Sequence, residues 1–132
     1  MSNQKKPNVE GITLYGRDFT VSGNKVFISN QITQNAPGML FIWASWCGHC
    51  TNFIPIFNSI EKKLGHKFTM LNIEDQELKK NPELARALNV QGYPTIKYFD
   101  QYNEIQADYV GERDEMSVLN SICKIYHFCY SG

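Results

Sequence analysis

The sequence predicts an α/β fold in which a central mixed β-sheet is flanked by helices on both faces. A continuous apolar run at 39–44 has the length of a strand that is covered on both sides. Apolar residues recur at helical spacing over 51–64 and again from residue 114 onward, whereas 95–99 and 105–110 flank a polar turn. An order of strand, helix, strand, helix, hairpin and closing helix is typical of a mixed sheet between two helix layers.

The N-terminal part predicts a tail and an extension of this sheet. Residues 1–8 show no apolar periodicity, so we expect a flexible tail there and a single domain over 9–132. Alternating apolar residues between 12 and 28, interrupted by the SGN at 22–24, predict short strands and a hairpin. Residues 29–35 favour a short helix before the central strand.

The middle of the chain alternates between strand and helix patterns. The long helix over 51–64 ends in front of Gly65, which is a suitable C-terminal cap. A second strand is expected at 67–73 and a short helix at 82–88. Between them, the polar run at 77–83 favours a solvated turn.

The C-terminal part predicts a hairpin and a helix. The runs at 95–99 and 105–110 are expected to be antiparallel neighbours because only a short polar turn separates them. The helix that follows Asp114 would place four residues on one face: Val118, Ile122, Ile125 and Cys129.

Composition limits the classes of partner. The 132 residues include 42% hydrophobic residues, enough for one globular core. Thirteen basic and thirteen acidic residues give no net charge, so electrostatics offers no argument for nucleic acid or an anionic membrane as partner. The polar start lacks the apolar block of a signal peptide, and we therefore expect a cytoplasmic monomer by default.

The pentapeptide WCGHC at 46–50 carries the chemistry. If Cys47 opens a helix, Cys50 lies three residues on, on the same side and within reach of a disulfide. Amide groups at the start of the helix would stabilise the thiolate of Cys47, which is then the attacking nucleophile. Cys50, one turn deeper, would attack the mixed disulfide at Cys47 and release the product. Such a dithiol centre needs no dissociable cofactor, since the cysteine pair holds the electrons.

Further strings follow this pentapeptide in a recognisable order. The matching elements are the apolar strand LFIWA, WCGHC, Pro55 five residues after Cys50, LNIE at 71–74, GYPT at 92–95, and Gly111. On these motifs the chain resembles the thioredoxin fold family over roughly residues 38–125. WCGHC and GYPTIKYF are similar to the protein disulfide isomerase branch of that family.

The resemblance implies a substrate groove beside the sulfurs. By the family's pattern the Tyr93–Pro94 peptide bond should be cis and pack against the active-site cysteines. The backbone of Tyr93 could then pair with an extended substrate strand, a mode of binding that tolerates many sequences. Trp46, Tyr93 and Gly111 would form the apolar rim of that groove.

Two polar residues are expected to tune the cysteines. His49 stands where reducing thioredoxins usually carry proline, and a histidine there would favour the thiolate and make the protein a better oxidant. Arg113, in the string YVGER, matches an arginine that the resemblance places near the resolving cysteine. Its guanidinium would stabilise the Cys50 thiolate during attack.

One departure from the family's pattern concerns proton transfer. The family places a buried carboxylate six residues before the first cysteine, where this chain has Phe41. The lysine that commonly accompanies it is replaced by Met70. Exchanging a buried ion pair for apolar residues can be neutral for the fold, but it removes a local base. We therefore expect the deprotonation of Cys50 to rely on water, His49 or Arg113.

The four cysteines allow other interpretations. The CxxC pair could be structural or half a zinc site, with Cys123, His127 and Cys129 as the other half. Six residues separate Cys123 from Cys129, so a helix would turn them to different faces, and we expect no metal. We expect Cys129 in the core and Cys123 at its edge, both as small apolar groups.

Three functions remain for the chain as a whole. The leading one is a thiol-disulfide oxidoreductase that forms or rearranges protein disulfides, with protein thiols and disulfides as substrates and glutathione, a reductase or an oxidase for recycling. One alternative is a thioredoxin-like reductant of protein disulfides. The other is a non-catalytic peptide-binding or chaperone domain that uses the groove around Tyr93 and Pro94.

Overall fold

A five-stranded mixed sheet forms the centre of the computed structural model, which describes residues 7–130. The strands lie in the order β1-β5-β4-β6-β7; β1, β5 and β4 are parallel, whereas β6 and β7 run antiparallel to their neighbours. Their bounds are β1 Ile12–Thr13, β4 Gly38–Trp43, β5 Thr69–Glu74, β6 Thr95–Phe99 and β7 Ile105–Asp108. The mixed central sheet that the sequence predicts is confirmed.

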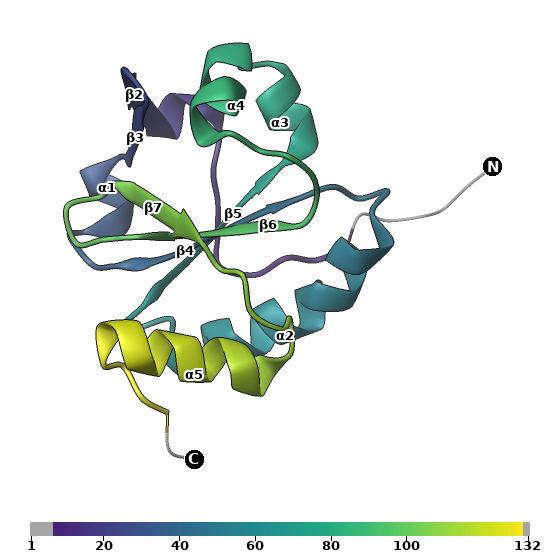
Figure 1. The fold of residues 1–132 in the computed structure, drawn as a ribbon, viewed down its shortest axis with the longest axis vertical. Helices are drawn as coiled ribbons and strands as arrows, with labels where there is room; N and C mark the ends of the chain where they lie inside the picture. The colour runs from purple at the N-terminus through teal and green to yellow at the C-terminus, as the bar shows by residue number, and fades with distance from the viewer. Residues whose placement is uncertain (1–6, 131–132) are drawn as a thin grey trace.

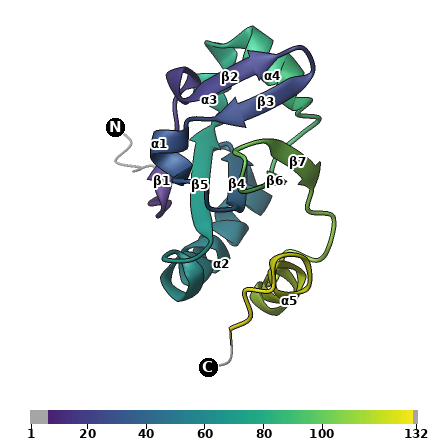
Figure 2. The ribbon, with the colours of Figure 1, turned by 90° about the vertical axis from the view of Figure 1, so that its left-hand side faces the viewer.

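Helices cover both faces of this sheet. Figure 1 shows α2 and α5 on one side and α3 and α4 on the other, and Figure 2 shows the β2–β3 hairpin on the side of α3 and α4. The bounds are α1 Asn30–Thr33, α2 Gly48–Leu64, α3 Asp75–Lys79, α4 Pro82–Leu88, α5 Glu115–Tyr126, β2 Phe19–Ser22 and β3 Lys25–Ile28, with a 3-10 turn at Gly16–Asp18. The hairpin and the short helix α1 agree with the sequence-based expectation.

Strand β4 shows why the sheet is covered on both sides. All six of its residues are buried, and successive side chains point to opposite faces of a strand. Met39, Phe41 and Trp43 pack into the cluster under α2 and α5. Leu40 and Ile42 pack into the cluster under α3 and α4. The strand therefore ends at a fixed position between two cores, and the loop that starts α2 is held there.

The polar run at 77–83 was wrongly expected to be a turn. Helix α3, Asp75–Lys79, occupies its first part, followed directly by α4. Leu78 is the only apolar residue of α3, so the sequence shows no helical period there. Burial of Leu78, together with the hydrogen bond that the Asp75 carboxylate accepts from Trp46, holds this turn of helix in place.

The C-terminal helix is shorter than expected, and its cysteines are not apolar core groups. Helix α5 ends at Tyr126, and His127 takes a left-handed conformation with φ 63° that turns the chain back. Cys129 lies beyond the helix, is exposed, and forms a disulfide with Cys123. The expectation of two free cysteines failed because it extended the helical spacing through His127, where the backbone leaves the helix.

Hydrogen bonds connect residues 8–10, near the start of the described chain, to α2. The Asn58 side chain donates a hydrogen bond to the carbonyl of Asn8 and accepts one from the amide of Glu10. Residues 1–6 of the expected tail lie outside the described residues. Within 7–130, no helix is long and apolar enough to cross a membrane.

Candidate active site

The two cysteines of WCGHC meet at the start of α2. Cys47 is the N-terminal cap of the helix, and its sulfur accepts a hydrogen bond from the amide of Cys50 at 3.2 Å. Both cysteines are in the thiol form. An amide directed at the sulfur from the positive end of a 17-residue helix stabilises negative charge there. The sequence-based placement of Cys47 at the opening of a helix is confirmed.

The two sulfurs have different surroundings. Cys47 keeps 7% of its surface exposed at the helix end, whereas Cys50 has none. Burial raises the pKa of Cys50 to about 12, and its hydrogen bond with Cys47 contributes to the rise. The backbone of Ala44 and the positive charge of Arg113 lower the pKa of Cys50, but by less. The charge of Arg113 thus reaches the resolving thiol, and a role for Arg113 in resolution stays a prediction.

A cis peptide bond faces the cysteines. The Tyr93–Pro94 bond is cis, as the family's pattern implies. The carbonyl of Tyr93 accepts a hydrogen bond from the thiol of Cys47 at 3.5 Å. One residue further on, the Thr95 hydroxyl donates to the carbonyl of Gly92 at 2.6 Å and closes the turn. The backbone of Tyr93 thus lies beside the outer sulfur, at the beginning of β6.

Trp46 is exposed but fixed in its orientation. Its side chain is 66% exposed, and its indole Nε1–H donates to Oδ2 of Asp75 at 2.9 Å. Its ring meets that of Tyr93 edge to face, with centroids 5.6 Å apart. These contacts join the start of α2, the start of α3 and the cis turn into one surface beside Cys47.

Asp75 is a site residue that the sequence reasoning missed. The residue is 1% exposed, and its Oδ1 has no hydrogen-bond partner within residues 7–130. Lys79 lies 3.9 Å from Oδ2. Burial, and secondly the negative charge of Asp75, raise the pKa of Tyr93. The sequence signal was weak, since Asp75 follows a buried strand within a run of charged residues.

The remaining predicted site residues, His49 and Gly111, lie at the surface. His49 is exposed on the first turn of α2. Gly111 lies in the loop between β7 and α5, two residues before Arg113. A Cβ atom on Gly111 would come within 2.5 Å of Oη of Tyr109, so a larger residue there would require the Tyr109 ring to move. A role of Gly111 in the groove stays a prediction.

Apolar packing occupies the place of the usual acid beneath Cys50. Phe41 is fully buried, with ring centroids 5.2 Å from both Phe53 and Phe57. Met70 is 2% exposed in the same cluster. The buried polar side chain nearby, Asn72, accepts the indole N–H of Trp43 at 3.1 Å. Within residues 7–130, no three His, Cys, Asp or Glu side chains gather as a metal site would require.

Comparison with known proteins finds a family that covers most of the chain. The thioredoxin family model matches residues 20–124. Thioredoxin of Rickettsia prowazekii is 31% identical over 98 residues, covering 74% of this chain and 90% of that protein. Protein disulfide-isomerase tigA of Aspergillus niger is 31% identical over 74% of this chain but only 27% of its own length. The chain thus spans about a quarter of the curated isomerases that it matches.

Solved structures agree with this fold. The thioredoxin Deadhead of Drosophila melanogaster superposes with a TM-score of 0.59 at 26% identity, over 72% of this chain and 86% of that one. Human ERp44 form I superposes with a TM-score of 0.65 over 91% of this chain and 30% of its own, at 17% identity. At that identity the second similarity concerns the fold alone.

Proposed function

This chain belongs to the thioredoxin family and carries a thiol-disulfide oxidoreductase domain, and we propose that the domain forms or rearranges disulfides in other proteins. The observation that supports this proposal best is that Cys47 and Cys50 differ in exposure. Cys47 reaches the surface at a helix start, whereas Cys50 is fully buried one turn away. The outer sulfur can meet a large substrate while the inner one is kept from it.

The exchange proceeds in two balanced steps. In the reducing direction the Cys47 thiolate attacks a substrate disulfide; a Cys47–substrate bond forms, and one substrate sulfur leaves as a thiolate and is protonated. The Cys50 thiolate then attacks Cys47, forms the Cys47–Cys50 disulfide and expels the second substrate thiolate. Two electrons pass from the pair to the substrate. Formation of a substrate disulfide is the same sequence in reverse.

The test of this function is capture of the intermediate. Cys50→Ser should accumulate substrates joined to Cys47 as mixed disulfides, because the sulfur that releases them is gone. Non-reducing gels and mass spectrometry of the adducts measure this. Cys47→Ser is the matched control and should capture few or none, since Cys50 is buried. Equal capture by both variants would refute the assigned roles.

The groove beside Cys47 is proposed to hold an extended segment of the substrate protein. The carbonyl of Tyr93 accepts the Cys47 thiol in the reduced form and becomes available to a substrate amide once that proton has left. Pro94 fixes the turn that presents this carbonyl. Trp46, held by Asp75, supplies an apolar wall.

Asp75→Leu should raise KM for a protein disulfide about three- to tenfold, with little change in kcat, because Trp46 loses a hydrogen bond of typical strength. Asp75→Asn keeps an acceptor oxygen and should stay near the wild-type KM. A small disulfide that does not fill the groove should react equally with all three proteins. Steady-state kinetics on both substrates measure this, and a drop in kcat on the small disulfide would contradict a role confined to positioning.

The redox potential distinguishes disulfide formation from reduction. With His49 between the cysteines, we expect a potential nearer the isomerase value of about −180 mV than the thioredoxin value of about −270 mV. His49→Pro should move it toward the thioredoxin value, since it removes a group that favours the thiolate. Equilibrium titration against glutathione gives both potentials. A wild-type potential at or below that of thioredoxin would favour the reductant instead.

A thioredoxin-like reductant is the second candidate. One observation favours it: the match to the Rickettsia thioredoxin covers nearly the whole of that protein, whereas the isomerases are about four times longer than the matched part. Reduction of insulin coupled to a reductase and NADPH tests this direction. A non-catalytic chaperone role requires that a Cys47→Ser, Cys50→Ser double variant keep full activity in a refolding assay.

A further inference from the structure

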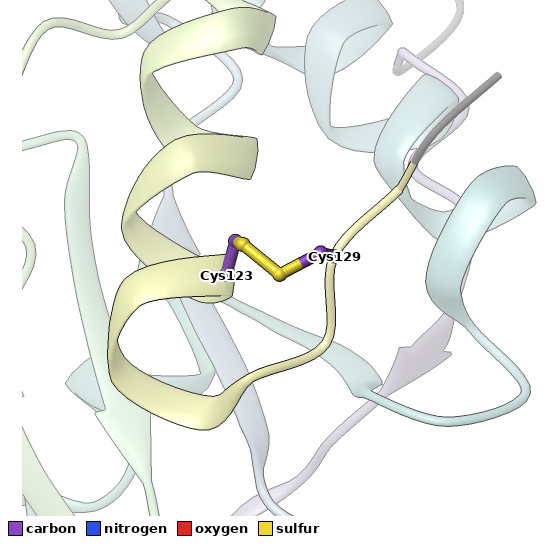
Figure 3. The surroundings of a disulfide bond; sticks show 2 residues. All are labelled: Cys123 and Cys129. Atoms are coloured by element: carbon purple, nitrogen blue, oxygen red, sulfur yellow. A yellow bond between two sulfur atoms is a disulfide. The ribbon is translucent and has the colours of Figure 1, made fainter.

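The disulfide between Cys123 and Cys129 lies away from the dithiol centre. Cys123 is on the last turn of α5, and Figure 3 shows the bond joining that turn to the segment that follows the helix. The amide of His127 donates to the carbonyl of Cys123 at 2.9 Å, so the chain turns back at that point. Figure 1 shows that α5 ends on the side of the molecule opposite the start of α2. The Cys47 pair and this bond are therefore separate redox groups.

Cys129 is open to an attacking thiol. Its side chain is exposed, whereas that of Cys123 is half-buried. Cys129 lines a surface pocket of about 420 Å³, a volume within the range of small-ligand sites of about 300–1,000 Å³. Both cysteines also line an adjoining pocket of about 450 Å³. Exposed disulfides of this kind are the ones that exchange, in contrast to buried structural bonds.

The first of these pockets is basic. Its lining residues include two lysines and two histidines but no carboxylate: Lys63, Leu64, His66, Lys67, His127, Phe128, Cys129 and Tyr130. Lys63 is paired with Glu115, whereas no ion pair within residues 7–130 involves Lys67. The side chain of Lys67 is exposed. A cation without a paired carboxylate attracts an anionic thiol and stabilises its thiolate.

We propose that Cys123–Cys129 is a second thiol-exchange site, at which an anionic small thiol of the glutathione class docks in this basic pocket and attacks Cys129. A bond forms between the incoming sulfur and the sulfur of Cys129. The Cys123–Cys129 bond breaks, and its electron pair stays on Cys123, which takes a proton. A second molecule of the same thiol attacks the mixed disulfide and leaves as the oxidised dimer. Two small thiols are oxidised and one cysteine pair is reduced.

Reduction releases the segment that the bond holds. Phe128 packs on Phe68 with ring centroids 6.3 Å apart, and Lys63 Nζ lies 5.1 Å from the ring centroid of Tyr130. In the reduced form the segment after α5 keeps these contacts but loses its covalent link to the helix. The proposed exchange thus controls how firmly residues 128–130 cover the end of α2, independently of the state of Cys47.

The test uses the full chain with Cys47→Ser and Cys50→Ser, so that Cys123–Cys129 is the disulfide whose reduction is measured. Reduction by glutathione and by neutral 2-mercaptoethanol is followed by alkylation and mass spectrometry, at low ionic strength and matched thiolate concentration. Lys67→Gln should slow reduction by glutathione about two- to fivefold and slow reduction by 2-mercaptoethanol less, because the glutathione thiolate also carries carboxylates whereas the thiolate of 2-mercaptoethanol carries a single negative charge. Lys25→Gln, which removes the same charge from the β2–β3 hairpin on the opposite face, should change neither rate.

Single variants identify the attacked sulfur. In Cys123→Ser the remaining Cys129 should form an adduct with oxidised glutathione several times faster than Cys123 does in Cys129→Ser, because Cys129 is the exposed partner. A bond that resists glutathione for hours overturns the proposal. Equal slowing with both thiols in Lys67→Gln also overturns it, since loss of the lysine charge must affect the more negatively charged glutathione thiolate more.

Discussion

Release of a mixed disulfide from Cys47 will accelerate about tenfold for each pH unit from pH 7 to pH 9, because only the thiolate of Cys50 attacks. Burial is the largest cause of the raised pKa of Cys50, which is about 12 in the dithiol, and burial remains when Cys47 is bound to a substrate, so the thiolate fraction of Cys50 should still rise with pH over this range. The chain holds Phe41 where a carboxylate could otherwise take the proton. We therefore expect resolution, and not the first attack, to limit turnover at neutral pH.

Stopped-flow release of a thiol from a preformed mixed disulfide measures this profile. Arg113→Met should slow release at pH 7 by up to about tenfold, since the charge of Arg113 lowers the pKa of Cys50 by less than burial raises it. Arg113→Lys keeps the charge and should lose less. A plateau in the wild-type profile below pH 9 would show that a base near Cys50 takes its proton, and the expectation would fail.

Phe41→Ala will lower the free energy of unfolding by about 3–5 kcal/mol, the cost of emptying a fully packed aromatic site. The ring of Phe41 contacts Phe53 and Phe57 at centroid distances of 5.2 Å, so α2 loses these aromatic contacts with β4. Urea unfolding at neutral pH measures the change. Phe41→Leu retains most of the volume and should lose less than half as much.

Phe41→Glu at the same position separates stability from proton transfer. A carboxylate without a partner in this cluster should destabilise the fold at least as much as alanine does. In the folded fraction it should nevertheless speed up release of the mixed disulfide at pH 7, because it supplies the missing base. A variant that folds and shows no acceleration would contradict the interpretation of Phe41 as the lost proton acceptor.

The parts of the fold that follow a strong pattern could be predicted from the sequence. The apolar run of β4, the helical spacing of α2 and the cis bond before Pro94 were expected and are present. Helix α3 could not be predicted, since its one buried apolar residue gives no period. Asp75 is the first residue of that helix. The hydrogen bond between Trp46 and Asp75 could therefore not be predicted from the WCGHC motif.

The second disulfide depends on a single backbone conformation. Helical spacing separates residues six apart, and only the left-handed turn at His127 brings Cys129 back to Cys123. Glycine and asparagine are the residues that usually adopt this left-handed conformation at the end of a helix, so a histidine at that position does not predict the turn. The sequence therefore indicates the chemistry at Cys47 much better than the chemistry at Cys129.

Both edges of the central sheet are poor templates for pairing with another chain. On one side the outermost strand, β1, is two residues long. On the other, β7 pairs with β6 through a shift of register, and Lys97 crosses to Asp108 at 2.5 Å. Short, irregular and charged edges discourage strands of neighbouring molecules from adding to a sheet. The two edges of the sheet therefore give the strands of neighbouring molecules little to pair with, which limits aggregation of this chain through strand addition.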